Sequence, residues 1–195
     1  NICSVVFKNS DRNRQWAYFS QPGPLTPVKH LALNLGAPGD RKDAGGSLWL
    51  GSPRPRGSLV LQLQVGMSFF PGYRYFTHDP ARLEIDGTED PWLFRSGLVG
   101  LRQCTIPVAE STDGRARYTV RLAFAELEHE AAGKRVFDIK LQGELVARDF
   151  DVFQAAGGKN RPVVKEFTGI DADEEVTVEF VPKTASPAPD QLPIV

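Results

Sequence analysis

The sequence predicts an all-β fold: a two-sheet antiparallel β-sandwich of the jelly-roll kind, with at most one or two short helical turns. The first observation is an alternation of apolar and polar residues, clearest at residues 118–124, 137–141 and 176–180. A period of two places one set of side chains in the core and the other in water. The second observation is that such segments are short and separated by glycine, proline and aspartate, as in sandwiches and jelly rolls.

Short strands are expected along the whole chain. Ahead of the alternating block they are expected at residues 3–7, 30–35, 58–65, 82–86 and 104–108. Within the block, Gly143 stands between two apolar runs and marks a hairpin turn.

Helical structure is expected to be minor. Residues 151–156 are predicted to form a helical turn that Gly157 ends, and residues 126–132 are a candidate for a second turn. Residues 184–191 are rich in proline and alanine and are expected to form a loop. Residues 192–195 look like the start of a closing strand.

Length and charge limit the class of protein. With 195 residues the chain is most simply one domain, large enough to bury a core without metal or disulfide support. A formal net charge of −1 gives no electrostatic reason to expect nucleic acid or an acidic membrane as partner. No apolar run approaches the roughly 20 residues of a membrane helix. Because the chain starts at Asn1 without a signal peptide, we expect an excised or processed piece.

The two cysteines leave two interpretations open. Cys3 and Cys104 could pair in a disulfide, closing a loop of about 100 residues and contributing about 4–5 kcal/mol. Alternatively both are buried free thiols, because free cysteine is a common core residue. No Cys-x-x-Cys spacing indicates a metal or redox site.

Several motifs resemble the malectin domain family, whose members are β-sandwich modules that bind glucose-containing glycans. The matching segments are residues 124–126, 136–143, 148–153 and 178–181, preceded by residues 33–36 with Asp40, Gly46 and Trp49. The resemblance implies a galactose-binding-like sandwich with its core at residues 29–182. Residues 1–28 would add a strand and loop, and residues 183–195 a loop and a closing strand, complete or truncated.

Residues 31–50 are most similar to bacterial malectin-type domains that follow propeller-like repeats in secreted multidomain proteins. That likeness implies an extracytoplasmic location, meaning periplasmic, cell-surface or secreted. It also implies flanking domains of a parent protein.

Sugar binding needs aromatic faces for pyranose C–H surfaces and polar groups for hydroxyls. Aromatic residues outside clear strands are the candidates, together with a neighbouring arginine: Trp49, Tyr73, Tyr75, Trp92, Phe94 and Arg95. For each aromatic residue, packing on the core or its edge is the competing interpretation. Four of them, exposed together, would indicate a platform: Trp49, Trp92, Tyr73 and Tyr75.

The family's own disaccharide site is largely replaced in this sequence. The resemblance places its aromatic pair at Glu128 and His129, and a further binding tyrosine near Gly97. Asp190 is the counterpart of the family's binding aspartate. Glu128 and His129 could therefore hydrogen-bond a different sugar, or no sugar at all.

Catalysis and metal binding have weak signals. The spacing of Glu84, Asp86 and Glu89 occurs in laminarinase-type jelly-roll glycoside hydrolases, where the outer glutamates carry retaining catalysis. The Asp-Gly pair inside this segment is equally a turn signal. Asp149 and Asp151 could hold calcium, but turn formation or ion pairing is favoured. We therefore expect no enzyme activity, no metal and no cofactor.

Three functions follow, in order of preference. The first is a non-catalytic, lectin-like carbohydrate-binding module of a larger extracytoplasmic protein. The second is a packing module that docks on a neighbouring propeller-like domain and binds no sugar. The third is a hydrolase that uses Glu84 and Glu89.

Overall fold

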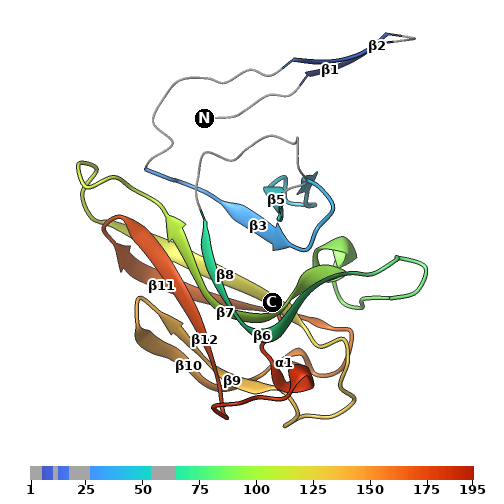
Figure 1. Ribbon diagram of the computed structural model, residues 1–195, viewed down its shortest axis with the longest axis vertical. Coiled ribbons are helices and arrows are strands. Elements are labelled where there is room, and N and C mark those ends of the chain that lie inside the picture. Colours follow the sequence, from blue (N-terminus) through green and yellow to red (C-terminus); the bar gives the residue numbers. More distant parts are fainter. Residues whose placement is uncertain (1–5, 11–12, 18–26, 54–64) are drawn as a thin grey trace.

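The computed structural model describes residues 6–10, 13–17, 27–53 and 65–195 (Figure 1). Its main sheet is five-stranded and antiparallel, in the order β10-β9-β12-β7-β6. The strands are β6 (Gly66–Thr77), β7 (Ser96–Pro107), β9 (Val136–Leu141), β10 (Glu144–Asp151) and β12 (Glu175–Pro182). A second sheet pairs β8 (Ala116–Ala125) with β11 (Pro162–Ala172). The predicted all-β fold is confirmed.

Two smaller sheets precede these strands. β1 (Val6–Ser10) and β2 (Asn13–Ala17) form an antiparallel pair. β3 (Ala32–Leu35), β4 (Arg41–Lys42) and β5 (Leu48–Ser52) form a three-stranded sheet. In that sheet β3 and β5 run parallel, which the sequence did not predict.

The core lies between the five-stranded sheet and the β8–β11 pair. The predicted alternation is confirmed in β9 and β12, where every second residue is buried. Four phenylalanine rings from β8, β9, β10 and β12 meet with centroids 5.0–6.3 Å apart: Phe124, Phe137, Phe150 and Phe180. Tilted and edge-to-face contacts at this spacing are favourable, so these rings fix how the two sheets pack.

The predicted hairpin and helical turn are both confirmed. β9 and β10 join through Gln142 and Gly143, whose φ angles of 51° and 79° are those of a tight primed turn. α1 (Val152–Ala156) begins after Asp151, whose side chain accepts a hydrogen bond from Gln154 N. It ends at Gly157, which is left-handed with φ 74°.

Other local predictions were wrong. Residues 126–132 form no helix, and residues 82–86 form no strand. Two short 3₁₀ turns were not predicted: η1 (Pro91–Phe94) and η2 (Pro189–Gln191). Each begins at a proline, which suits the first helical position. The expected strand residues 3–5 and 58–64 lie outside the described residues.

Residues 193–195 run beside β7. Leu98 and Val195 exchange backbone hydrogen bonds of 2.8 and 3.0 Å, and Gly100 N donates to Pro193 O at 2.7 Å. β12 pairs with β7 only between Gln103 and Pro107. Residues 193–195 pair with the part of β7 that precedes Gln103. Leu192 and Ile194 are buried there. No helix among the described residues is long and apolar enough to cross a membrane.

Candidate functional site

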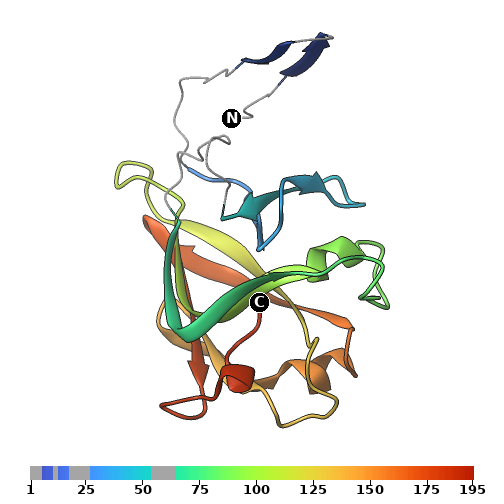
Figure 2. The same ribbon diagram turned by 45° about the vertical axis from the view of Figure 1, so that its right-hand side comes forward.

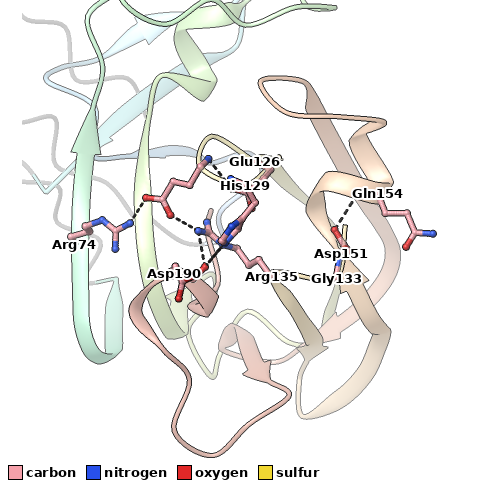
Figure 3. Close-up of polar contacts among 9 residues, drawn as sticks. Arg74, Glu126, His129, Gly133, Arg135, Asp151, Gln154 and Asp190 are labelled. Atoms are coloured by element: carbon pink, nitrogen blue, oxygen red, sulfur yellow. Dashed lines mark hydrogen bonds and ion pairs between the residues drawn. The ribbon is translucent and has the colours of Figure 1, made fainter. Parts of the chain in front are cut away.

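Polar groups from four parts of the chain meet beside η2 (Figure 3). We call this group the arginine–glutamate cluster. Its members are Arg74 of β6, Glu126, Glu128 and His129 of the loop after β8, Arg135 immediately before β9, and the backbone carbonyl of Asp190. Three sequence candidates, Glu128, His129 and Asp190, are thus brought together.

Arg135 lies at the centre of the cluster and is 2% exposed. Its Nε and Nη2 atoms donate to the carbonyl oxygen of Asp190 at 3.3 and 3.1 Å. Nη2 also donates to Glu128 Oε2 at 2.6 Å, and Nε lies 3.4 Å from Glu126 Oε2. The remaining nitrogen, Nη1, is buried without a hydrogen-bond partner among the described residues. A buried charged donor without an acceptor is costly, so this atom requires an explanation.

Glu126 shapes the loop that replaces the expected helical turn. Its Oε1 accepts hydrogen bonds from the backbone N–H groups of Glu128 and His129, at 2.9 and 3.1 Å. Its carbonyl accepts from Asn160 N at 2.8 Å. Because its other oxygen faces Arg135, this fully buried carboxylate is compensated on both sides.

Glu128 carries the cluster to the surface, where its side chain is 39% exposed. Burial alone would raise the pKa of Glu128. Hydrogen bonds and charge from Arg74 and Arg135 outweigh that effect and hold the pKa of this carboxyl below its ordinary value. Arg74, itself partly exposed, forms an ion pair with the Glu128 oxygen that Arg135 does not bind. Glu128 is therefore held from two sides.

His129 and Asp190 close the cluster. His129 Nε2 lies 2.7 Å from Asp190 O and donates to it, since a carbonyl only accepts. The resemblance implies that the Asp190 carboxylate binds the ligand. In the cluster, however, Asp190 contributes its backbone carbonyl.

Glu126, Glu128 and His129 present ligand atoms within 4.8 Å of one another, a spacing suited to a cation. Arg135 already lies against the carboxylates of both Glu126 and Glu128. The negative charge of these two carboxylates is therefore compensated by arginine, and no metal is needed to balance it.

The predicted aromatic residues fall into separate places. Trp49 and Trp92 are partly exposed, and the hydrogen bond from Ala44 N to Asp90 joins the segments that carry them. Tyr73 is exposed and stacks on Phe69 at 4.3 Å, and Tyr75 packs edge-on against both rings. Only Tyr73 of the four is exposed, whereas Trp49, Tyr75 and Trp92 are partly buried, so the four are not exposed together as the predicted platform requires.

The two other candidates of this group, Phe94 and Arg95, make contacts within the domain. Phe94 is buried, in a small apolar cluster with Ile85 and Ala125. Arg95 Nε donates to the carbonyl of Leu83 at 2.8 Å.

The remaining candidates also have structural partners. Glu84 and Glu89 are exposed in an irregular segment, with no strand to aim them, so the hydrolase interpretation finds no support. Asp149 pairs with Lys183, and Asp151 caps α1. Cys104 is buried and forms no disulfide with any described residue, and burial raises the pKa of its thiol to about 11. Cys3 lies outside the described residues, so the disulfide stays a prediction.

Sequence reasoning missed Arg74, Glu126 and Arg135. The one available signal was Glu126 inside the Phe-Ala-Glu motif, where a charged residue follows directly on buried strand residues. Arg135 gave none, because an arginine ahead of a strand is usually exposed.

The fold defines a β-sandwich module, and comparison identifies its family. The profile described as Malectin domain matches residues 64–183, more than half of the sequence. The chain therefore belongs to the Malectin domain family. The boundaries suggested by the sequence, including the core at residues 29–182, stay predictions.

Curated relatives are receptor proteins of Arabidopsis thaliana. A probable LRR receptor-like serine/threonine-protein kinase is 40% identical over 60 residues, which cover 28% of this chain and 6% of that protein. Receptor-like protein 4 is 30% identical over 99 residues, covering 49% of this chain and 16% of that protein. The chain thus spans only a small part of the length of these relatives.

Solved structures share the fold. A Bacteroides uniformis β-glucuronidase matches 80% of this chain with 16% of its own, at a TM-score of 0.58 and 21% identity. The extracellular domain of ANXUR2 from Arabidopsis thaliana matches 84% of this chain with 45% of its own, at a TM-score of 0.53 and 14% identity.

Proposed function

We propose that this domain is a non-catalytic glycan-binding module of a larger extracytoplasmic protein, and that it holds a sugar hydroxyl at the arginine–glutamate cluster. Family membership supports a binding role without bond-making. The position of the cluster supports the site, because Glu128 and His129 stand where the resemblance places the family's binding residues.

The proposal rests on Nη1 of Arg135, which is buried and has no hydrogen-bond partner among the residues that the structure describes. Nη1 and Nη2 are attached to the same guanidinium carbon. Nη2 donates a hydrogen bond of 2.6 Å to the Glu128 carboxylate. An oxygen that accepts from Nη1 therefore lies close to that carboxylate. A hydroxyl group suits this position, because it accepts from the guanidinium and donates to Glu128. Sugars present such hydroxyls in quantity.

We infer that a ligand reaches the buried Nη1 when the ion pair between Arg74 and Glu128 opens. Nη1 itself is sealed, whereas the side chains of Arg74 and Glu128 are 41% and 39% exposed. An exposed ion pair contributes little to stability, so its opening costs little. Binding is expected to be weak, because no aromatic pair replaces the family's own and small polar sites gain little per contact.

A glycan array followed by calorimetric titration of the best hits tests the proposal. Glu128→Ala should weaken a hit by about tenfold or more, because a hydrogen bond to a charged group is lost. The matched control is Glu130→Ala, which removes an exposed carboxylate of the same loop that pairs with Lys159. Equal affinity of the Glu128 variant and wild type would overturn this site.

A docking module is the second candidate, and one observation favours it. Both carboxylate oxygens of Glu128 already form ion pairs inside the domain, with Arg74 and Arg135. A surface held rigid in this way also suits an interface that another domain covers. Docking would be favoured if the glycan array gives no hit and the domain binds a flanking domain of the parent protein. Glu128→Ala should then abolish that binding.

The parent protein is part of the proposal. The resemblance of residues 31–50 supports a secreted bacterial multidomain protein with propeller-like repeats. The Arabidopsis thaliana relatives and the ANXUR2 extracellular domain support a receptor ectodomain. Both contexts support a location outside the cytoplasm.

A further inference from the structure

Trp49 and Trp92 lie in adjoining segments that the structure joins. Trp49 belongs to β5 and Trp92 to η1, 43 residues later in the chain. The loop between β4 and β5 contacts the segment before η1, where Ala44 N donates to both carboxylate oxygens of Asp90 at 3.2 and 3.0 Å. Figure 2 shows the β4–β5 hairpin above the η1 turn.

Each indole is held by a carboxylate. Trp49 Nε1 donates to Asp43 Oδ2 at 2.9 Å, and Trp92 Nε1 donates to Asp90 Oδ1 at 2.9 Å. Asp43 is itself fixed, since its Oδ1 accepts from Ser47 N at 2.8 Å. Both rings are therefore set in one orientation while remaining partly exposed. An ordered aromatic ring loses little conformational entropy when a ligand stacks on it.

Arg41 places the two indoles on a common surface. It pairs directly with Trp49 across the antiparallel β4–β5 strands, so the two side chains share one face of the sheet. Its guanidinium lies over one face of the Trp92 ring, with the guanidinium carbon 4.8 Å from the ring centre. Arg41 is exposed, so its N–H groups are accessible to a ligand on this surface. We call Arg41, Trp49 and Trp92 the tryptophan surface.

We propose that the tryptophan surface is a second glycan-binding site, separate from the arginine–glutamate cluster, and that it takes neutral pyranose chains. An indole face that Arg41 does not cover takes the C–H face of a pyranose, and Arg41 donates to the hydroxyl or ring oxygens of the sugar. The two sites have no residue in common. Two sites on one module would raise the avidity for a polysaccharide that reaches both.

Local charge favours neutral over acidic chains. Residues 40–43 and 89–90 contain four acidic residues, Asp40, Asp43, Glu89 and Asp90, and two basic residues, Arg41 and Lys42. A uronic acid or a phosphate would approach this excess of negative charge unfavourably.

The test titrates the 195-residue chain with neutral oligosaccharides: cellohexaose, laminarihexaose, maltohexaose, xylohexaose and mannohexaose. Binding is followed by tryptophan emission and by calorimetry. Trp92→Ala should weaken the best of these ligands by about tenfold, because a stacking contact is lost. Arg41→Ala should weaken it by about threefold, because one exposed donor is lost.

Two controls separate this site from the first. Arg117→Ala removes an exposed arginine of β8 that pairs loosely with Asp171, and it should change nothing. Glu128→Ala should leave binding at the tryptophan surface intact. If none of the five oligosaccharides binds, or if Trp92→Ala binds as wild type does, the inference is wrong. A ligand lost in Glu128→Ala and kept in Trp92→Ala would support only the first site.

Discussion

Arg135 and Asp190 are 55 residues apart in sequence, yet two guanidinium nitrogens of Arg135 donate to the carbonyl oxygen of Asp190 at 3.3 and 3.1 Å. This contact fixes the C-terminal turn η2 over the loop that follows β8. His129 donates to the same carbonyl. One buried arginine therefore links β9, that loop and the C-terminal segment.

Removal of Arg135 should be strongly destabilising. In Arg135→Met the carboxylate of Glu126, whose side chain is 1% exposed, keeps its burial and loses its cation. Breaking a buried pair in this way costs about 3–5 kcal/mol of unfolding free energy. Arg74→Met breaks only a half-exposed pair and should cost about 1 kcal/mol or less. Urea denaturation measures both, and equal costs would contradict the central role of Arg135.

The pH dependence of stability should show the contribution of Glu128. Its pKa is lowered below the ordinary 4.5, so folding is favoured by its ionised form. This contribution is complete above the unfolded-state pKa and is lost as pH falls from about 4.5 through the folded-state value. Glu128→Gln should therefore be less stable than wild type at neutral pH, with the gap closing in acid. A gap that stays constant down to about pH 3 would refute the assignment.

Cys104 should be chemically inert in the native protein. Burial raises its pKa to about 11, and only the thiolate is a nucleophile. In a Cys3→Ser variant, iodoacetamide at about pH 8 should leave Cys104 unmodified until denaturant is added. Mass spectrometry measures this, and rapid labelling without denaturant would contradict the burial. The unreduced mass of the wild-type protein tells separately whether Cys3 and Cys104 are bonded.

Asp151 should stabilise two segments at once. Its carboxylate accepts from Gln154 N at 3.0 Å, capping α1, and from Gly133 N at 2.5 Å in the loop before β9. Asp151→Ala should lower the unfolding free energy by about 1–2 kcal/mol. Asp171→Ala, which removes an exposed partner of Arg117, serves as the control and should cost about 0.5 kcal/mol or less. Thermal unfolding of both variants gives the comparison.

Local patterns accounted for the strands and for α1. Phe137, Ile139 and Leu141 alternate with polar residues, and that period predicts a half-buried strand wherever the strand is placed. The same local reasoning was wrong for residues 126–132, where hydrogen bonds from a side chain to the backbone replace a helical turn. The Glu126 carboxylate takes the backbone N–H groups of Glu128 and His129 and sets a turn instead.

The sequence by itself determined the all-β class, the hairpin at Gly143 and the family resemblance that selected Glu128, His129 and Asp190. These depend on side-chain period, turn chemistry and motif order, all of which are local. Only the tertiary structure decided that Arg135 is buried, that Asp190 acts through its carbonyl, and that the segments carrying Trp49 and Trp92 are in contact. Each of these depends on which distant segments pack together, because burial and charge pairing are properties of the assembled sheets.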